Sequence, residues 1–455
     1  MDNRGGRRQR GEGTVRFRCN FRNTVYDVLK SRGWKETNSE TNWDIHWADR
    51  DWVYDVFDSM HLESWQRLNH YRNGRELCRK DLLVKNIKRK KRQLEKEGAY
   101  DEAQAYNFLP VSFVLPREYA MFVEEFKRQG GVWIMKPIGS AQGKGIFLFT
   151  RLSEISEWRT DFKQRLDRKD RQEPQVEAYI VQRYIMDPYL VGGKKFDLRL
   201  YALVTNFSPL TVWMHRTGFA RFTNTRYNND IKNIENMFVH LTNVAIQKKA
   251  DDYDDRTGGK WDVQQLKSYM VSVFGMPVVD ALFWEIQMIV IRSLLSVQQV
   301  MINDKHCFEL YGYDVMIDSS LKPWLIEVNA SPSLSANTQE DYLLKSQMLN
   351  DAFDIIDLEG KMQGDEEHVG GFDLIYDDGY VDIDPTKCGY STYLGAVCHE
   401  KETFGDPTNT DYGHFFLANY GSREQKAAIP EPLRLGKSAS NEDIDGQEVQ
   451  HAKGK

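Results

Sequence analysis

Cys307-Phe-Glu-Leu-Tyr-Gly-Tyr-Asp-Val-Met-Ile-Asp318 and Pro323-Trp-Leu-Ile-Glu-Val-Asn329 decide the fold of this chain. Both runs are apolar and of strand length, and the short polar link between them predicts a hairpin. The simplest antiparallel register pairs Asp318 with Pro323. That register places Asp314 directly opposite Glu327, in the middle of an otherwise apolar hairpin.

Two carboxylates that face each other across such a hairpin should repel. Asn329 lies on the same face as Glu327, because side chains alternate along a strand. A divalent cation would remove the repulsion, and oxygens from Asp314, Glu327 and Asn329 suit magnesium bound to nucleotide phosphates. The alternative is an exposed hairpin face with unrelated acids, since acids usually lie on solvated surfaces.

Composition limits the class of protein. The chain has 455 residues, enough for two or three domains, and its 41% hydrophobic and 12% aromatic residues allow large cores. A net charge of −6 provides no overall basic field for nucleic acid. The five cysteines are scattered without a CxxC pair, which predicts reduced thiols in an intracellular compartment.

Neither end nor middle of the sequence predicts membrane insertion. Residues Met1–Arg10 are polar and basic, without the apolar segment of a secretory signal. The longest apolar run, Phe283–Met301, contains Glu285, Gln287 and Arg292, and therefore predicts a buried helix. We expect a soluble intracellular protein.

Composition shifts divide the chain into five segments. The N-terminal domain should contain a strand near Val15–Cys19, a helix near Asn23–Arg32 and a basic run, Arg72–Arg92; the next domain should contain a helix at Arg117–Gln129 and a strand at Val132–Lys136. Charged residues 161–175 predict a flexible excursion. The predicted segments are a disordered 1–13, an N-terminal domain 14–107, a central domain 108–190, a C-terminal domain 191–358 and an acidic, partly disordered tail 359–455.

A glycine-rich loop follows the strand that ends at Lys136. Gly139, Gly143 and Gly145 let the backbone approach phosphate oxygens closely, and successive amides form an anion-binding nest. The loop is not a P-loop, because Ile146 stands where that motif needs a lysine and a hydroxyl residue. An ordinary turn is the alternative interpretation.

Within the run Lys194–Val204, charged and apolar side chains alternate from Lys195 to Leu200. One face carries Lys195, Asp197 and Arg199, and the other face is hydrocarbon. Because the strand is long, we expect it to be central and its charged face to line a polar cavity, with exposure to water as the alternative. Asp197 suits a ribose hydroxyl or a metal, and Arg199 suits a terminal phosphate.

Three shorter motifs fit the same site. Tyr179–Ile185 is an apolar strand whose backbone could meet an adenine, and His240-Leu-Thr-Asn243 ends an apolar stretch with two side chains suited to a nucleotide. Arg216 and Arg221 could fork onto a carboxylate, although surface arginines are the commoner case.

Together these motifs resemble the tubulin tyrosine ligase-like family of ATP-grasp carboxylate–amine ligases, and within it the glutamylating branch. The resemblance runs from about Asn69 to Leu334. It implies an α+β ATP-grasp fold with an N-terminal α/β domain, a central domain and a C-terminal ATP-grasp domain. The motifs that carry it are Leu77–Leu83, Trp133–Pro137, Gly143–Ile146, Val181–Ile185, Lys195–Arg199, His240–Asn243, Gly312–Asp314 and Ile326–Leu334.

The resemblance also implies a role for each matching residue. Lys136, Arg199 and Glu327 would act in catalysis, Asp314, Glu327 and Asn329 would bind Mg²⁺, and Arg221 and Lys260 would bind the free amino acid. ATP would be bound by Lys136, Gln142, Gly143, Gln182, Arg183, Tyr184, Ile185, Lys195, Phe196, Asp197, Thr242 and Asn243. Val244 departs from the family, in which Tyr often follows the Thr-Asn pair.

The implied reaction is ATP-dependent addition of L-glutamate to the acidic tails of tubulin through an acyl phosphate. The implied setting is cytoplasmic and cytoskeletal, including the cilium or flagellum axoneme and the basal body. The basic run Arg72–Arg92 would attract the acidic tails of tubulin towards the site. The alternatives are a solvated helix face and non-specific RNA binding. Because residues 351–384 are acidic, we expect weak microtubule binding without a targeting partner. The alternatives are a glycine or tyrosine ligase, and a catalytically silent microtubule-binding scaffold.

Overall fold

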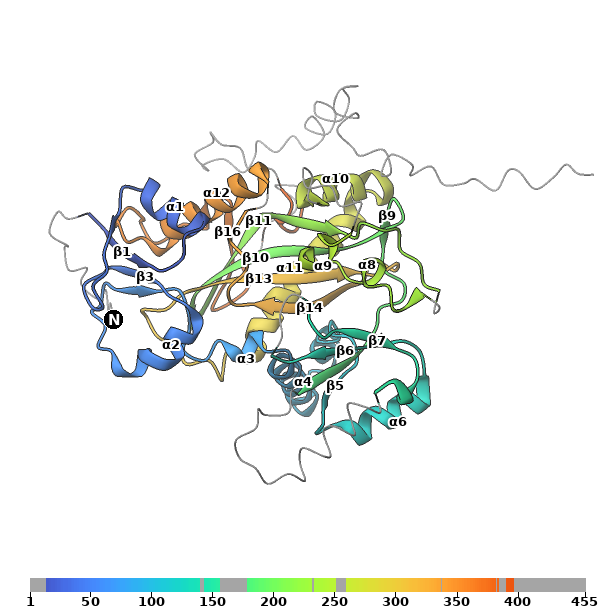
Figure 1. Ribbon diagram of the computed structural model, residues 1–455. Coiled ribbons are helices and arrows are strands. Elements are labelled where there is room, and N and C mark those ends of the chain that lie inside the picture. The colour runs from blue at the N-terminus through green and yellow to red at the C-terminus, as the bar shows by residue number, and fades with distance from the viewer. Residues whose placement is uncertain are drawn as a thin grey trace, which may run out of the picture.

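Three β-sheets organise the computed structural model, which describes residues 14–139, 143–155, 178–230, 233–250, 259–336, 338–381, 383 and 390–396 (Figure 1). The model is a mixed α/β structure, as expected for the fold class. Sequence-based predictions for residues 1–13, Gln142, residues 161–175 and the chain beyond 396 lie outside the described residues.

A parallel sheet of order β2-β1-β3-β4 forms the N-terminal unit, blue in Figure 1. The predicted strand and helix in this unit are confirmed to within one residue at each end. The helix begins where the Asn23 side chain accepts a hydrogen bond from Val25 N, which satisfies a free amide of its first turn. The elements are β1 (Arg16–Cys19), α1 (Thr24–Ser31), β2 (Lys35–Glu36), β3 (Ile45–Trp47), α2 (Arg50–Val56), the 3₁₀ helix η1 (Phe57–Ser59) and β4 (Arg67–Leu68).

A smaller antiparallel sheet of order β5-β8-β6-β7 follows. Helix α6 covers one face, where Phe122 packs edge-on against Trp133 and Phe149. The predicted helix and the two predicted strands of this sheet are confirmed, with small shifts at their ends. The elements are β5 (Ser112–Leu115), α6 (Tyr119–Gln129), β6 (Trp133–Pro137), β7 (Phe147–Phe149), the 3₁₀ helix η2 (Leu152–Ile155) and β8 (Tyr179–Arg183).

The central eight-stranded sheet has the order β14-β13-β10-β11-β16-β15, with β12 paired to β11 and β9 to β10. The predicted hairpin forms its edge, and all nine residues of β13 are buried. Its strands are β9 (Leu190–Val191), β10 (Lys194–Phe207), β11 (Leu210–Phe222), β12 (Lys260–Asp262), β13 (Glu309–Ile317), β14 (Pro323–Asn329), β15 (His368–Val369) and β16 (Phe372–Asp377).

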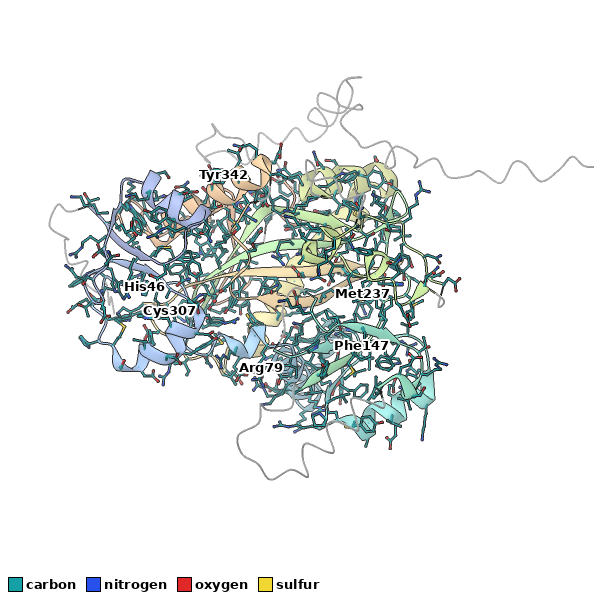
Figure 2. The ribbon with its side chains drawn as sticks, in the orientation of Figure 1. His46, Arg79, Phe147, Met237, Cys307 and Tyr342 are labelled. Carbon is teal, nitrogen blue, oxygen red and sulfur yellow. The ribbon has the colours of Figure 1, made fainter. Side chains whose placement is uncertain are left out.

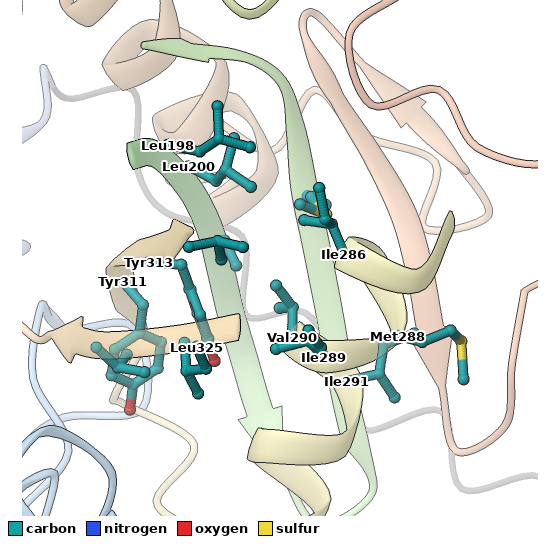
Figure 3. Packing of buried hydrophobic residues seen from close by; sticks show 14 of the residues in the cluster. Leu198, Leu200, Ile286, Met288, Ile289, Val290, Ile291, Tyr311, Tyr313 and Leu325 are labelled. Carbon is teal, nitrogen blue, oxygen red and sulfur yellow. The ribbon is translucent and has the colours of Figure 1, made fainter. Parts of the chain in front are cut away.

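Helices cover both faces of this sheet. On the hydrocarbon face of β10, Leu198 and Leu200 pack in one core with Ile286 and Val290 of the long buried helix α11 (Figure 3). Within the described residues, no helix is long and apolar enough to cross a membrane. The helices are α3 (Arg75–Cys78), α4 (Lys80–Lys96), α5 (Tyr100–Ala105), α8 (Met237–His240), α9 (Val244–Gln247), α10 (Val263–Phe274), α11 (Met276–Val297) and α12 (Gln339–Ile356).

The opposite face of β10 changes character along the strand. Tyr201 and Leu203 lie in a second core with Phe353 of α12 and with side chains of the N-terminal sheet. Towards the start of the strand, Lys195 and Asp197 line a pocket instead. Lys195 and Asp197 thus lie where the sheet faces a pocket, whereas Tyr201 and Leu203 pack beneath α12 and the N-terminal unit.

Two strands lie where the sequence predicts an acidic tail. Residues 368–377 form β15 and β16, and β16 pairs with β11, so the tail boundary at 359 is wrong for this segment. Phe372 and Ile375 are buried, and the Asp373 carboxylate is neutralised by Arg216. The acidic composition of this segment did not predict a buried strand, because the arginine that balances Asp373 lies in β11.

Candidate active site

A pocket lies between the central sheet and the small sheet and contains about 950 Å³ of empty space, part of it open to solvent. Of the predicted site residues, those that line the pocket are Lys136, Gly143, Gln182, Arg183, Tyr184, Ile185, Lys195, Asp197, Thr242, Asn243, Asp314, Glu327 and Asn329. The pocket thus brings together strands β6, β8, β10, β13 and β14 with the start of α9.

The remaining predicted residues lie elsewhere. Phe196 points into the hydrophobic core on the other face of β10, so its side chain does not contribute to the pocket. Arg199, Arg221 and Lys260 lie beyond the pocket lining, along the same polar face of the central sheet. Gln142 lies outside the described residues.

The hairpin places Asp314 opposite Glu327, as predicted, and Gly312 opposite Asn329. The pairing near the loop differs from the prediction, because Ile317 rather than Asp318 pairs with Pro323. A β-bulge between the two regions adds one residue to β14 and restores the expected register at Asp314. The bulge residue, Ile326, also lines the pocket.

Asp314 is buried and is held by two arginines. Arg199 Nε lies 2.6 Å from Asp314 Oδ1, and Arg221 Nη2 lies 2.9 Å from Asp314 Oδ2. Burial alone would raise the pKa of Asp314, but the two guanidinium groups outweigh it and hold this pKa well below its usual range. Asp314 is therefore a carboxylate throughout the physiological pH range.

Gly312 lies close to Pro332 and beside the side chain of Arg199. A β-carbon at Gly312 would lie 2.8 Å from the side chain of Pro332 and 3.4 Å from Arg199 Cδ. The contact with Pro332 is too close for a β-carbon, whereas the distance to Arg199 Cδ is an ordinary one, so the Gly-Tyr-Asp motif needs glycine here to accommodate Pro332.

Arg221 is shared between two carboxylates. Its guanidinium contacts both oxygens of Asp197, which faces it across β10 and β11, and also reaches Asp314. Burial opposes the charge of Arg221, but Asp197 and Asp314 raise the pKa of Arg221 well above its usual value. Arg221 thus forks onto carboxylates of the protein itself, and its contact with a substrate carboxylate stays a prediction. Arg216 likewise forks onto Asp373.

Two buried lysines face the pocket from different sheets. Lys136 Nζ donates to Gln182 Oε1 at 2.8 Å, and burial lowers the pKa of Lys136 to about 8 although Glu327 acts in the opposite direction. Burial also lowers the pKa of Lys195 to about 7, against the attraction of Asp197. Both amines are thus easily deprotonated until an anion enters the pocket.

The glycine-rich loop contacts α9 across the pocket. Gly143 has a φ of 76°, and a β-carbon there would lie 2.5 Å from Ile246 Cδ1 in α9. A larger residue would push the loop away from the Thr242–Asn243 segment. Met237 of α8 packs in one hydrophobic cluster with Val132, just before β6, and Leu148 of β7. Figure 2 labels Met237 and also Phe147, the neighbour of Leu148 in β7.

Lys80 is a pocket residue that the sequence analysis did not single out. It begins α4, and its Nζ lies 3.4 Å from Glu327 Oε2. Glu327 therefore has a cationic neighbour from a helix that is more than two hundred positions away in the chain. The only signal in the sequence was the position of Lys80 inside the Leu77–Leu83 motif.

Lys260 belongs to a separate charged group at the far end of the polar face. It pairs with Arg221 in the register of β11 and β12, and its Nζ lies 2.9 Å from Asp341 Oδ2. Lys345 Nζ lies 2.9 Å from Asp341 Oδ1, so α12 supplies a buried carboxylate that two lysines share. Asp341 and Lys345 were missed, because nothing local in α12 connects them to β12.

The comparisons with known proteins identify the family of the chain. The description that matches residues 58–364 is "Tubulin-tyrosine ligase family". The chain is 45% identical over 423 residues to the probable tubulin polyglutamylase TTLL9 of Rattus norvegicus, covering 85% of this chain and 91% of the relative. It is 47% identical over 364 residues to the probable tubulin polyglutamylase ttll-9 of Caenorhabditis elegans, covering 79% and 84%.

A more distant relative has a related name. The chain is 42% identical over 391 residues to the probable alpha-tubulin polyglutamylase Ttll1 of Tetrahymena thermophila, covering 80% of this chain and 93% of the relative. These matches confirm the resemblance inferred from the ordered motifs. The chain belongs to the tubulin-tyrosine ligase family.

Proposed function

We propose that this chain is an ATP-dependent ligase that adds L-glutamate to glutamate side chains or glutamate chains on tubulin tails. The observation that carries the proposal is the convergence in one pocket of two buried lysines with Asp314, Glu327 and Asn329. The names of the relatives, tubulin polyglutamylases, support glutamate and tubulin as the substrates.

The donor set of the hairpin fits Mg²⁺. Carboxylate and amide oxygens are the ligands that this hard cation prefers. Asp314, Glu327 and Asn329 all face the pocket, and the two carboxylates are cross-strand neighbours that cations of the protein now balance. Within the described residues, no group of three or more His, Cys, Asp and Glu side chains could hold a metal, so the proposed set depends on the Asn329 amide. Bound magnesium would neutralise charge on the terminal phosphates.

The chemistry follows from bringing three anions together. An acceptor carboxylate attacks the γ-phosphorus of ATP, the bond to the ADP oxygen breaks, and an acyl phosphate forms. The amine of free glutamate then attacks the acyl carbon, phosphate leaves and the amine proton is lost to solvent. Lys136, Lys195 and Arg199 supply the positive charge that these steps need, in a site where burial strengthens electrostatic interactions.

The choice of amino acid is assigned to Arg221 and Lys260. Both lie on the polar face of the central sheet, one strand apart, and both already bind carboxylates of the protein. An incoming amino-acid carboxylate can exchange with one of these partners without exposing an uncompensated charge. Addition of glycine or tyrosine is the competing activity, and a silent scaffold is the competing non-enzymatic function.

A ligation assay separates these functions. The purified chain is incubated with microtubules, ATP, magnesium and either glutamate, glycine or tyrosine, and the tubulin tails are analysed by mass spectrometry. We expect added glutamate only. Addition of glycine or tyrosine alone would change the proposed amino-acid substrate. Absence of all three products with a folded chain would favour a catalytically silent scaffold.

Glu327→Gln tests the site itself in the same assay. Glu327 is partly exposed, so the neutral amide should leave the fold intact while it removes a proposed metal ligand. Glu340→Gln is the matched control on the surface of α12. Unchanged glutamylation by Glu327→Gln would refute the proposed site.

The cellular context is part of the proposal. The exposed side of α4 carries Lys85, Arg89, Arg92 and Lys96 along one groove, which suits an acidic tubulin tail. Two residues of the run have internal partners, since Lys88 donates to Ser112 O and Arg89 donates to Ser296 O. We propose action on cytoskeletal microtubules, including those of the cilium axoneme and basal body, with a targeting partner that supplements weak intrinsic binding.

A further inference from the structure

A chain of hydrogen bonds runs behind the pocket from Lys195 to a main-chain carbonyl. Lys195 Nζ lies 2.8 Å from the hydroxyl of Tyr184, which lies 3.0 Å from His240 Nδ1. His240 Nε2 lies 3.2 Å from the main-chain oxygen of Asn233. All three side chains are buried: Tyr184 directly follows β8, Lys195 lies in β10 and His240 ends α8.

The main-chain oxygen of Asn233 determines which atom donates in each of these hydrogen bonds. A carbonyl oxygen can only accept, so His240 Nε2 must carry the hydrogen. Burial and the nearby charge of Lys195 lower the pKa of His240 to about 4, so the ring is neutral and Nδ1 is an acceptor. The hydroxyl of Tyr184 therefore donates to His240 and accepts from Lys195.

This arrangement leaves one hydrogen of Lys195 for the pocket. An ammonium group has three N–H donors. One is directed to the Tyr184 hydroxyl and a second to the main-chain oxygen of His240, 2.8 Å away. Lys195 lines the pocket, so the third N–H faces the space where an anion would lie.

We propose that Tyr184 and His240 are positioning residues that aim the third N–H of Lys195 at the phosphates of the nucleotide. The inference rests on the proposed function, in which Lys195 contacts ATP. It changes the part played by Tyr184, whose side chain serves the phosphate end of the pocket while its main chain belongs to the strand expected beside the adenine.

The test measures the affinity of the full chain for a non-hydrolysable ATP analogue with Mg²⁺. Tyr184→Phe and His240→Leu each interrupt the series of hydrogen bonds behind Lys195, whereas His240→Asn keeps an acceptor near the position of Nδ1. We expect the first two to weaken binding about tenfold, the effect of losing one hydrogen bond to a charged group, and His240→Asn to stay within about threefold. Tyr106→Phe, a buried tyrosine beside α5, is the control.

A double-mutant cycle separates positioning from general damage. If Tyr184 acts through Lys195, then Tyr184→Phe should have no further effect on analogue affinity in a Lys195→Met background. A merely structural loss would instead add to the effect of Lys195→Met. Circular dichroism and thermal melting check that each variant is folded.

The measurements distinguish failure of the proposed function from failure of the positioning role. If Lys195→Met leaves analogue affinity unchanged, the phosphate-binding role of Lys195 in the proposed function fails. If Lys195→Met weakens binding but Tyr184→Phe and His240→Leu do not, or their effects are additive with it, the proposed function stands and the positioning role is refuted.

Discussion

Arg199 on β10 donates two hydrogen bonds to the carboxylate of Asp314 on β13, with Nε 2.6 Å from Oδ1 and Nη2 3.1 Å from Oδ2. The two residues are direct partners in the register of these strands. An aspartate proposed to bind magnesium is thus already engaged by an arginine proposed to bind phosphate. Metal and arginine compete for one carboxylate, and a bound triphosphate would relieve the competition by attracting both.

Arg199→Met should separate metal binding from catalysis. Removing the guanidinium leaves Asp314 with Arg221 as its one arginine partner, so the Mg²⁺ concentration that half-stabilises the nucleotide-free chain in thermal melts should fall about tenfold, equivalent to one charge-assisted contact. Ligation should fall at least a hundredfold, because the γ-phosphate loses a cation. If stabilisation by Mg²⁺ is unchanged in Arg199→Met, Asp314 is not a ligand; Glu327→Gln should abolish the stabilisation.

Binding of ATP should take up protons from solution above pH 7. Burial lowers the pKa of Lys195 to about 7 and that of Lys136 to about 8, and an entering triphosphate raises both pKa values again. Proton uptake is therefore expected between about pH 7 and pH 9 and not near pH 6, where both amines are already charged. Calorimetry in buffers of different ionisation enthalpy measures it, and the uptake should shrink in Lys195→Arg.

The same shift makes the stability of the nucleotide-free chain depend on pH. The pKa of Lys195 is lower in the folded chain than in the unfolded chain, so the unfolded state binds more protons between about pH 7 and pH 10. The free energy of unfolding should consequently rise with pH in that window. The rise should be smaller in Lys195→Met, as measured by urea unfolding at several pH values.

The buried pair of Arg216 and Asp373 should anchor β16 to the sheet. Both side chains are about 5% exposed and meet in a two-pronged contact of 2.8 and 2.6 Å. Asp373→Ala leaves a buried guanidinium uncompensated and should lower the free energy of unfolding by about 3–5 kcal/mol. Thr211→Val, which removes an exposed contact to Asp377, is the control and should cost less than about 1 kcal/mol. Equal losses would argue against the anchoring role.

Lys260→Met should affect the amino-acid substrate selectively. Lys260 lies outside the nucleotide pocket and shares Asp341 with Lys345. The KM for glutamate should rise about tenfold or more, in line with the loss of one charged contact, while the KM for ATP stays unchanged. Lys361→Met, on the surface, is the control. An equal rise in both KM values would place Lys260 in a structural role.

Charge reversal on the exposed side of α4 should weaken the encounter with tubulin. Lys85→Glu, Arg92→Glu and Lys96→Glu combined should raise the KM for microtubules without lowering kcat, and should reduce the salt dependence of the rate. A triple variant at the exposed Lys30, Lys35 and Lys305 has the same change in net charge and is the matched control. Identical behaviour of the two variants would remove the proposed tail-binding role of α4.

Local patterns predicted the parts of the fold that depend on nearby residues. Alternation along Lys194–Val204 correctly separated the polar face from the hydrocarbon face of β10, because side-chain direction in a strand is set by the backbone alone. The apolar run that includes Phe283 correctly predicted a buried helix. The facing pair of Asp314 and Glu327 was also predicted, although a bulge that the sequence did not reveal was needed to produce it.

Local sequence patterns did not predict the contacts between distant segments of the chain. The position of Lys80 beside Glu327, the sharing of Asp341 by two lysines, and the pairing of β16 with β11 each join residues far apart in the chain. The partners of Arg221 were likewise expected in a substrate and found in the protein. Side-chain charge alone does not identify which opposite charge will lie within reach.

By itself, the sequence determined the strands that line the pocket, the face of β10 on which Lys195 and Asp197 lie, and the candidates for phosphate and metal binding. Only the tertiary structure decided how those charges are balanced: Arg199 and Arg221 on Asp314, Tyr184 and His240 behind Lys195, and α12 beside Lys260. The reason is physical. Strand geometry is a local property of the backbone, whereas the electrostatic interactions of a buried charge depend on every group that folding brings within a few ångströms of it.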